Sequence, residues 1–178
     1  KRFAKTKLLK KHQIPKKLTK GVSLEILEVM DTLAAYQLKA NVLLDIGAHK
    51  GMFSRGANLQ FKFKQSVLFE PNLSLKIHIE ENNKDFKYKY EPIALSDGDG
   101  ELTFYVHPDD TMSSLVETDK KILKDEFPWD NPDKVRAIPV QTCTMDDYVE
   151  RNGLNGNNFF LKLDTQGNEL NILRHGLK

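Results

Sequence analysis

Short apolar runs alternate with longer amphipathic or polar stretches along most of the chain. Four runs have the length and character of buried strands: residues 42–46, 66–71, 88–94 and 159–164. The stretches that follow strands predict helices over residues 52–59, 73–83, 145–151 and 166–174. Strands and helices that alternate at this spacing are typical of βαβ units. The pattern therefore predicts an α/β fold, with a mostly parallel sheet and helices on both of its faces.

A further helix is expected ahead of the first strand. Apolar residues recur at helical spacing from Ile26 to Leu38, and Ser23 stands where an N-cap is needed. Such a helix has one apolar face, so we expect residues 21–40 to hold a helix that covers the sheet.

The part of the chain between the third and fourth strands lacks this regular alternation. Residues 97–100, Asp-Gly-Asp-Gly, favour a tight turn, which predicts that residues 101–106 and 88–94 form a hairpin or an antiparallel extension. Residues 107–135 contain three prolines and no clear periodicity, and residues 135–142 are a further strand candidate. Long irregular loops in compact domains are usually functional or mobile, so we expect residues 107–135 to govern specificity.

The net charge of +2 hides a strong asymmetry. Residues 1–20 hold nine of the 27 basic residues and no acid, so the remainder carries 18 bases against 25 acids. An acidic body argues against nucleic-acid binding over the main surface. The basic arm, residues 1–20, is either a solvated, partly disordered segment or a contact for an anionic surface such as lipid, nucleic acid or a polyanionic glycan.

Several classes of protein are disfavoured by composition. No stretch approaches the roughly 18 consecutive apolar residues of a membrane span. The single cysteine, Cys143, cannot form an internal disulfide, and basic residues interrupt the start of the chain before a signal-peptide core can form. We therefore expect a cytoplasmic protein with no membrane span. His78, His107 and His175 lack the spacing of a metal site, so no metal is expected.

Three of the apolar strands end in an acid: Asp45, Glu70 and Asp164. Ligands of open α/β sheets bind beyond the carboxyl ends of the strands, so these acids are expected to line one crevice. Residues 47–51, Gly-Ala-His-Lys-Gly, supply small residues where a ligand approaches the backbone. Glu70 follows Gly51 by 19 residues, which is close to the spacing at which an acid binds a ribose diol.

These features indicate a cofactor that contains adenosine. The P-loop pattern is absent, and the dinucleotide pattern G-x-G-x-x-G fails because position 49 is His and position 52 is Met. The negative charge of Asp45 suits a pyrophosphate poorly. It suits the amine or sulfonium of S-adenosylmethionine better.

The chain resembles the FkbM-type S-adenosylmethionine-dependent methyltransferases, and the resemblance covers residues 42–177. The most specific block is Lys162-Leu163-Asp164-Thr165-Gln166-Gly167-Asn168-Glu169, with the pattern K-x-D-x-Q-G-x-E. The other matching segments are 44–51 (LDIGAHKG), 69–71 (FEP), 94–97 (ALSD), 113–115 (SSL), 140–142 (VQT) and 145–147 (MDD).

The resemblance implies a Rossmann-like class I methyltransferase sandwich, in which residues 41–178 are the methyltransferase domain. Such folds usually have a seven-stranded sheet, so we expect the chain to be truncated before its last strands. The implied cofactor-binding residues are Asp45, Gly47, Ala48, His49, Gly51, Glu70, Pro71, Ala94, Leu95 and Asp164.

Within that set, the resemblance implies a role for each group. Gly47 and Ala48 pass under the methionine part, with Asp45 near its polar end. Glu70 accepts both ribose hydroxyls, and residues 94–95 flank the adenine. Asp164 lies close to the methyl group and the acceptor.

The base that deprotonates the acceptor is not identified by the pattern. Asp164 is the first candidate, because a strand-end carboxylate can accept a hydroxyl proton, Glu169 is the second and His49 the third. Structural alternatives remain open, since acids at strand ends and helix starts also cap turns. Lys162, inside an apolar strand, is expected to meet an acid or to lie at an edge, because an unpaired buried ammonium group is costly.

Residues 107–135 offer two further candidates for contact with the acceptor. Phe127 and Trp129 fit either a sugar-stacking platform or a small cluster that packs the loop down. Ser113 and Ser114 fit either acceptor contacts or local turn caps.

The leading interpretation is O-methylation of a hydroxyl on a sugar or other natural product, with S-adenosylmethionine as the methyl donor. One alternative is a nicotinamide-dependent oxidoreductase that uses the same crevice. The other is a non-catalytic adaptor that docks on a polyanion through the basic arm. The pattern carries no signal for oligomeric state.

Overall fold

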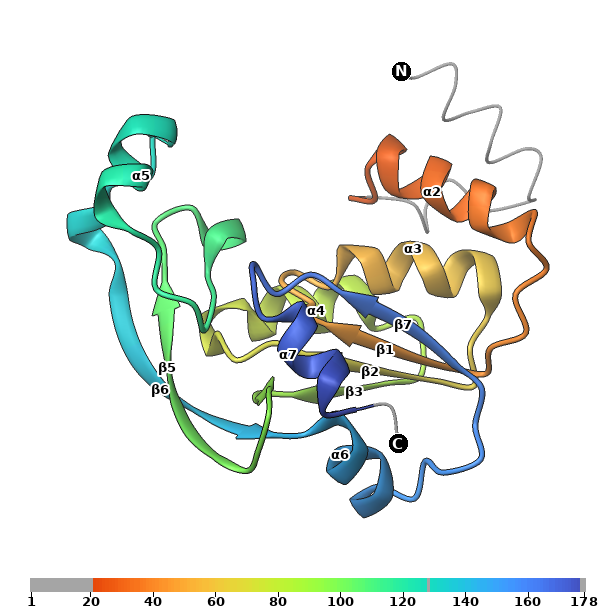
Figure 1. Ribbon diagram of the computed structural model, residues 1–178. Coiled ribbons are helices and arrows are strands. Elements are labelled where there is room, and N and C mark those ends of the chain that lie inside the picture. Colours follow the sequence, from red (N-terminus) through yellow and green to blue (C-terminus); the bar gives the residue numbers. More distant parts are fainter. Residues whose placement is uncertain (1–20, 128, 177–178) are drawn as a thin grey trace.

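The computed structural model of the protein describes residues 21–127 and 129–176 (Figure 1). The basic arm expected over residues 1–20 lies outside this part of the chain. The described residues form two β-sheets with helices packed around the first of them. None of the described helices combines the length and apolar character needed to cross a membrane.

The central sheet is parallel, as predicted. Its strands are β1 (Val42–Ile46), β2 (Gln65–Phe69), β3 (Tyr88–Glu91) and β7 (Phe159–Leu163), in the order β3-β2-β1-β7. Successive strands are added on one side of β1 as far as β3, whereas β7 pairs with the other side of β1. The strand order therefore reverses between β1 and β7, which creates a topological switch point.

One face of this sheet packs against α6 (Met145–Arg151) and α7 (Glu169–Arg174). Successive side chains of a strand point to opposite faces, so every second residue of β1 and β2 contributes to this layer. The buried cluster that results includes Val42, Leu44, Ile46, Val67, Phe69, Met145, Tyr148 and Ile172.

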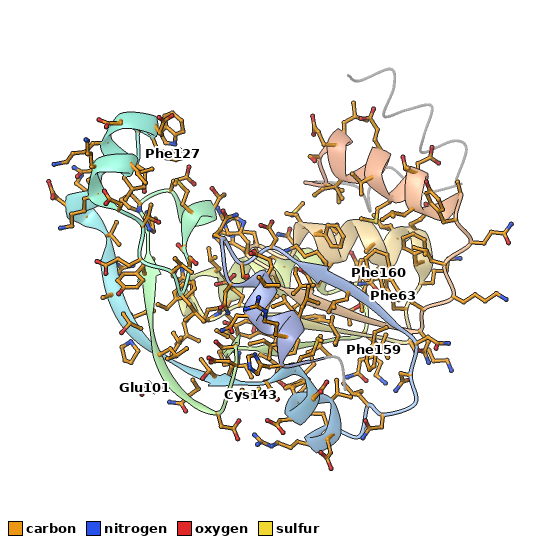
Figure 2. The ribbon with its side chains drawn as sticks, viewed as in Figure 1. Phe63, Glu101, Phe127, Cys143, Phe159 and Phe160 are labelled. Carbon is orange, nitrogen blue, oxygen red and sulfur yellow. The ribbon has the colours of Figure 1, made fainter. Side chains whose placement is uncertain are left out.

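The opposite face is covered by α2 (Leu24–Ala34), α3 (Met52–Phe61) and α4 (Lys76–Asn83). Phe63 and Phe160 lie together on this face, with ring centroids 5.8 Å apart (Figure 2). The buried residues of the layer include Met30, Leu43, Ala57, Leu68 and Ile79. Helices thus cover both faces, as the alternating pattern predicted.

Several predicted helices differ at their ends: α3 runs to Phe61 instead of residue 59, and α7 begins at Glu169 instead of residue 166. The helix expected to reach Leu38 stops at Ala34, and the following turn contains Gln37 with φ 51°. Tyr36 and Leu38 are exposed, so burial provides no support for a longer helix. The helix expected over 73–83 begins as a 3₁₀ turn, η2 (Leu73–Leu75), before α4.

The predicted hairpin between residues 88–94 and 101–106 is wrong. Pro92 lacks an N–H group, and the chain divides there into β3 and the short strand β4 (Ala94–Leu95). β5 (Gly100–Val106) pairs antiparallel with β6 (Arg136–Cys143), and β4 pairs parallel with β6. The antiparallel extension therefore exists, but its partner is the strand predicted at 135–142.

Residues 100–143, here called the ribbon, extend away from the central sheet (Figure 1). The segment between β5 and β6, which the sequence predicts to be irregular, contains regular structure. It contains η3 (Asp110–Met112), α5 (Lys120–Glu126) and η4 (Pro132–Lys134). Asp119 caps α5 by accepting hydrogen bonds from the Lys121 and Ile122 N–H groups. Only Leu123 of α5 is buried, so no apolar periodicity marks this helix in the sequence.

Candidate functional site

A cavity opens at the carboxyl edge of the parallel sheet, at the switch point. The chain leaves β1 at Gly47, β2 at Glu70 and β7 at Asp164, and all three residues line the cavity. The cavity encloses about 750 Å³, including its solvent-open mouth.

The Glu70 carboxylate is buried at the edge of this cavity. Its Oε2 accepts a hydrogen bond from the His49 N–H (2.9 Å), and its Oε1 accepts one from the Asn72 N–H (2.9 Å). Each carboxylate oxygen has a further lone pair, so both remain able to accept a hydroxyl. Burial raises the pKa of Glu70 to about 7, although the two N–H donors oppose the rise. A ligand that donates to this carboxylate therefore stabilises its ionised form.

An apolar wall adjoins Glu70. It is formed by Phe69, Pro71, Ile93, Ala94 and Leu95, so the predicted residues Pro71, Ala94 and Leu95 all line the cavity. The Asn168 side chain donates to the Leu95 carbonyl (3.0 Å), which ties the wall to the loop after β7. A flat apolar group fits this wall better than a charged one.

The loop after β1 requires a glycine at position 47. Gly47 has φ 74°, and a Cβ there would lie 2.0 Å from the Asp164 carbonyl oxygen. The close approach of the β1 and β7 connections therefore excludes any side chain. Its neighbour in the loop, His49, also has a positive φ of 51° and lines the cavity.

Asp45 does not reach the cavity. It is fully buried on the face of β1 below α3, and its Oδ2 accepts a 2.6 Å hydrogen bond from Ser54. The Lys162 ammonium lies 3.1 Å from the Asp45 Oδ1 and donates to the Gly47 carbonyl (2.5 Å). Lys162 thus meets an acid, as expected, on the edge strand of the described sheet. Asp45 therefore stabilises the loop after β1 indirectly, through Lys162 and the Gly47 carbonyl.

The loop between β7 and α7 is held together by Glu169. Its Oε1 accepts from the Thr165 N–H (2.6 Å) and hydroxyl (3.0 Å), and its Oε2 accepts from the Gly167 N–H (3.0 Å). These bonds outweigh the opposing effect of burial and lower the pKa of Glu169. Asp164 is different: its side chain is 60% exposed, lines the cavity and accepts a hydrogen bond from Gln166 (3.0 Å).

The ribbon supplies the remaining wall of the cavity. Phe104 and Leu115 are its apolar members, and Asp110, Thr111 and Ser113 are its polar ones. Ser114, beside them, donates to the Thr165 and Gln166 carbonyls (3.0 and 2.9 Å), which joins the ribbon to the loop after β7. Ser113 thus lines the site, whereas Ser114 joins its two walls.

Phe127 and Trp129 lie away from this cavity. Figure 2 shows Phe127 at the tip of the ribbon beside α5, whereas Cys143 lies at the base. The two rings pack edge to face at 5.6 Å, and Trp129 is 66% exposed. Neither residue lines the cavity.

The sequence-predicted site residues fall into two groups. Those that line the cavity are Gly47, His49, Glu70, Pro71, Ala94, Leu95 and Asp164. Asp45, Ala48, Gly51 and Glu169 do not: Ala48 is buried against Leu68 and Ile79, and Gly51 begins α3. A Cβ at Gly51 would lie 2.3 Å from the Asn83 side chain, so packing accounts for this glycine.

Sequence reasoning missed most of the ribbon wall and Ile93. No local signal marks Asp110 or Phe104, because only the fold of the ribbon brings them to the sheet edge. Thr165, Gln166 and Asn168 also line the cavity, and they lie inside the K-x-D-x-Q-G-x-E block. That block was therefore sufficient to suggest them.

The charges of the cavity lining favour a cationic or neutral ligand over a diphosphate. Glu70, Asp110 and Asp164 are acidic, and among the described lining residues there is no lysine or arginine. An acidic lining repels phosphate groups. Within residues 21–127 and 129–176, no three His, Cys, Asp or Glu side chains are grouped so that they could hold a metal ion.

The chain matches a known protein family over most of its length. The family model described as the methyltransferase FkbM domain matches residues 45–178, which includes every wall of the cavity. No curated protein and no solved structure matches the chain.

Proposed function

Because the chain belongs to the family of FkbM methyltransferase domains, we propose that it transfers a methyl group from S-adenosylmethionine to a hydroxyl oxygen. The observation that carries the proposal is the buried carboxylate of Glu70 at the cavity edge. Both of its oxygens are oriented by backbone N–H groups and keep a lone pair for a ribose diol. The spacing between Gly51 and Glu70 supports the same role.

The residues around the cavity fit the parts of this donor. Glu70 binds the two ribose hydroxyls, and the apolar wall of Phe69, Ile93 and Leu95 accommodates the adenine. Gly47 leaves room for the methionine part above the β1 loop. Asp45 acts indirectly in this proposal, because its carboxylate holds Lys162 against the Gly47 carbonyl.

S-adenosylmethionine, when bound, supplies a methyl group on a positively charged sulfur. The acidic lining stabilises positive charge there, and Asp164 is the exposed acid at the end of β7. The chain's own contribution is to position the acceptor hydroxyl and to receive its proton. Glu169 contributes by holding the Asp164–Gly167 loop in place.

The acceptor is expected to be a small hydroxylated molecule such as a sugar or another natural product. The ribbon wall presents Asp110, Thr111 and Ser113, which can hydrogen-bond to several hydroxyls at once. Phe104 and Leu115 beside them fit the apolar face of such a molecule.

Calorimetry with S-adenosylhomocysteine tests the donor site. The wild-type chain should bind it, and Glu70→Ala should lose at least about tenfold in affinity because hydrogen bonds to a charged group contribute roughly 1.5–3 kcal/mol. Glu81→Ala, which removes an exposed acid on α4, is the control and should bind normally. Unchanged affinity in Glu70→Ala would contradict the assignment of Glu70.

A second experiment addresses the reaction. The chain is incubated with S-adenosylmethionine and a panel of monosaccharides and their methyl glycosides, and mass spectrometry detects O-methyl products. Binding of S-adenosylhomocysteine without any product would favour the adaptor alternative. A change in NADH fluorescence on mixing, without S-adenosylhomocysteine binding, would favour the oxidoreductase alternative.

A further inference from the structure

We propose that His49 is the general base that accepts the proton of the acceptor hydroxyl, and that Asp110 and Lys50 orient it. The inference rests on the methyl transfer proposed above and adds the residue that carries the proton. It replaces Asp164 and Glu169 as the first candidates for this role.

His49 occupies a constrained position in the cavity lining. Its backbone has φ 51°, which is unusual for a residue other than glycine, and its N–H binds the Glu70 carboxylate. Residues held in such conformations are concentrated at functional sites. The side chain is 30% exposed and lines the cavity together with Asp164 and the ribbon wall.

The His49 ring is paired with a carboxylate from another element. Its Nε2 lies 2.7 Å from Asp110 Oδ1, and Asp110 belongs to η3 of the ribbon. Within the part of the chain that the structure describes, Nδ1 has no hydrogen-bond partner. An anionic partner at Nε2 favours the tautomer with the proton on that nitrogen, so the Nδ1 lone pair is left to accept a proton.

Lys50 fixes the carboxylate that orients the ring. Its ammonium lies 2.8 Å from Asp110 Oδ2. Burial opposes ionisation of Asp110, but hydrogen bonds from Lys50 and His49 outweigh it and lower the pKa of Asp110. The charged groups around His49 are Asp110 on η3, which contacts the ring, and Glu70 after β2, which contacts the backbone N–H, while Lys50 contacts Asp110. Asp110 stabilises the imidazolium once it forms, and Lys50 holds the Asp110 carboxylate in place.

The two other candidate bases are less suited to the task. The three donors on the Glu169 carboxylate lower its pKa, and Glu169 does not line the cavity. Asp164 lines the cavity, but its carboxylate is 60% exposed and already accepts a hydrogen bond from Gln166. The His49 ring is instead oriented by a carboxylate from another element, which is the arrangement of a positioned base.

The proton balance is simple. The acceptor O–H bond breaks, and its proton forms an N–H bond with His49 Nδ1. The oxygen keeps the electron pair, with which it bonds to the methyl carbon, and the electrons of the broken carbon–sulfur bond remain on sulfur. The imidazolium then releases its proton to solvent through the exposed part of the ring.

Two variants test the base. Asparagine tolerates a positive φ, so His49→Asn preserves the loop and the N–H bond to Glu70. His49→Gln keeps a side-chain donor for Asp110. Both should bind S-adenosylhomocysteine with wild-type affinity but lose about 100-fold or more in kcat with the methylated monosaccharide from the panel. His78→Gln, an exposed histidine on α4, is the control and should retain full kcat.

The pH profile and the imidazole itself give independent readouts. The wild-type kcat should fall at acidic pH with the titration of one group, and this limb should disappear in His49→Gln. Nitrogen-15 NMR should show the Nε2–H tautomer of His49, and Asp110→Asn should weaken the preference for this tautomer because the anion that holds the Nε2 proton is removed. An Nδ1–H tautomer, a retained acidic limb, or kcat within threefold of wild type in both variants would overturn the proposal. Failure of S-adenosylhomocysteine to bind the wild-type chain would instead contradict the proposed function.

Discussion

The ammonium group of Lys162 lies 3.1 Å from the carboxylate of Asp45, its partner in register on the neighbouring strand. Asp45 is fully buried, and the Lys162 side chain is 13% exposed. Lys162 also donates to the Gly47 carbonyl, so one ion pair supports both the sheet and the loop below the cavity. Removal of Lys162 leaves the buried Asp45 carboxylate without its cation, whereas removal of Asp45 leaves Lys162 with the more distant Asp164 carboxylate at 3.9 Å.

Lys162→Met should therefore destabilise the chain strongly. Breaking one side of a buried pair typically costs about 3–5 kcal/mol. The double variant Lys162→Met/Asp45→Asn removes both charges and should recover part of this loss. Urea denaturation of the wild type, both single variants and the double variant measures the coupling. Strictly additive losses would show that the two residues are not energetically linked.

Gly47→Ala should disrupt the junction between β1 and β7. The added Cβ would meet the Asp164 carbonyl oxygen in addition to the unfavourable φ of 74°. Gly153→Ala is the matched control, because Gly153 has φ 62° and nothing within 4 Å of its Cβ position. The control should lose about 1–2 kcal/mol from backbone strain alone. Gly47→Ala should lose clearly more in thermal or urea unfolding, and equal losses would contradict the close approach.

Glu70 should make the protein less stable as pH rises. Its pKa is raised from 4.5 to about 7, so between these values the folded chain retains a proton that the unfolded chain has released. The stability is fully present below pH 4.5 and falls by about 3 kcal/mol as pH rises to 7. Glu70→Gln removes this titration. The unfolding free energy of the variant, relative to that of the wild type, should therefore increase as pH rises from 4.5 to 7. A constant difference from pH 4.5 to 7.5 would contradict the raised pKa.

The affinity for S-adenosylhomocysteine should also depend on the ionisation of Glu70, but it should rise with pH whereas stability falls. Ribose hydroxyls donate to the ionised carboxylate, so binding should strengthen as pH rises through 7 and level off above it. Calorimetry at several pH values in buffers of different ionisation enthalpy should also detect proton release on binding. Affinity that is constant from pH 5.5 to 8 would argue against contact with Glu70.

The local stability of the ribbon should depend on the buried pair of His107 and Asp130. His107 Nδ1 lies 2.5 Å from Asp130 Oδ2, and Asp130 Oδ1 accepts from the Asp109 N–H (2.9 Å). Asp130→Ala leaves the buried His107 ring and the partly buried Asp109 N–H without an acceptor, so residues 107–134 should exchange amide hydrogens about 10- to 100-fold faster. Residues 42–46 should keep their protection. Asp125→Ala, an exposed acid on α5, is the control, and a uniform change across both regions would contradict a local effect.

Much of the fold followed from local signals. Apolar runs such as 42–46 and 159–163 are short and continuous because a parallel strand is buried on both faces. The helices that cover them carry their own caps, such as Thr144 before α6. The division at Pro92 had a signal as well, but two adjacent strands in different sheets cannot be told from one strand by composition.

Part of the site was equally predictable. Strand-end acids and the loop glycines indicated where a ligand binds, and six of the seven predicted lining residues follow β1 or β2 or precede the ribbon. Asp45 and Glu169 were assigned to the site by residue type and position alone. In the structure, Asp45 binds Lys162 and Ser54, and Glu169 binds the Thr165–Gly167 loop, so neither carboxylate is available to a ligand. Hydrogen-bond competition of this kind depends on distances that spacing does not supply.

The sequence by itself determined the parallel sheet, its carboxyl-edge acids and the likeness to one methyltransferase family, because these depend on periodicity and on short contiguous motifs. The tertiary structure decided which acids face the cavity and which lie beneath it. It also brought Asp110, 61 residues from His49, to within 2.7 Å of the histidine ring. The physical reason is that the ribbon folds back against the sheet edge through β6 and Ser114, and contacts between such distant residues leave no periodic trace along the chain.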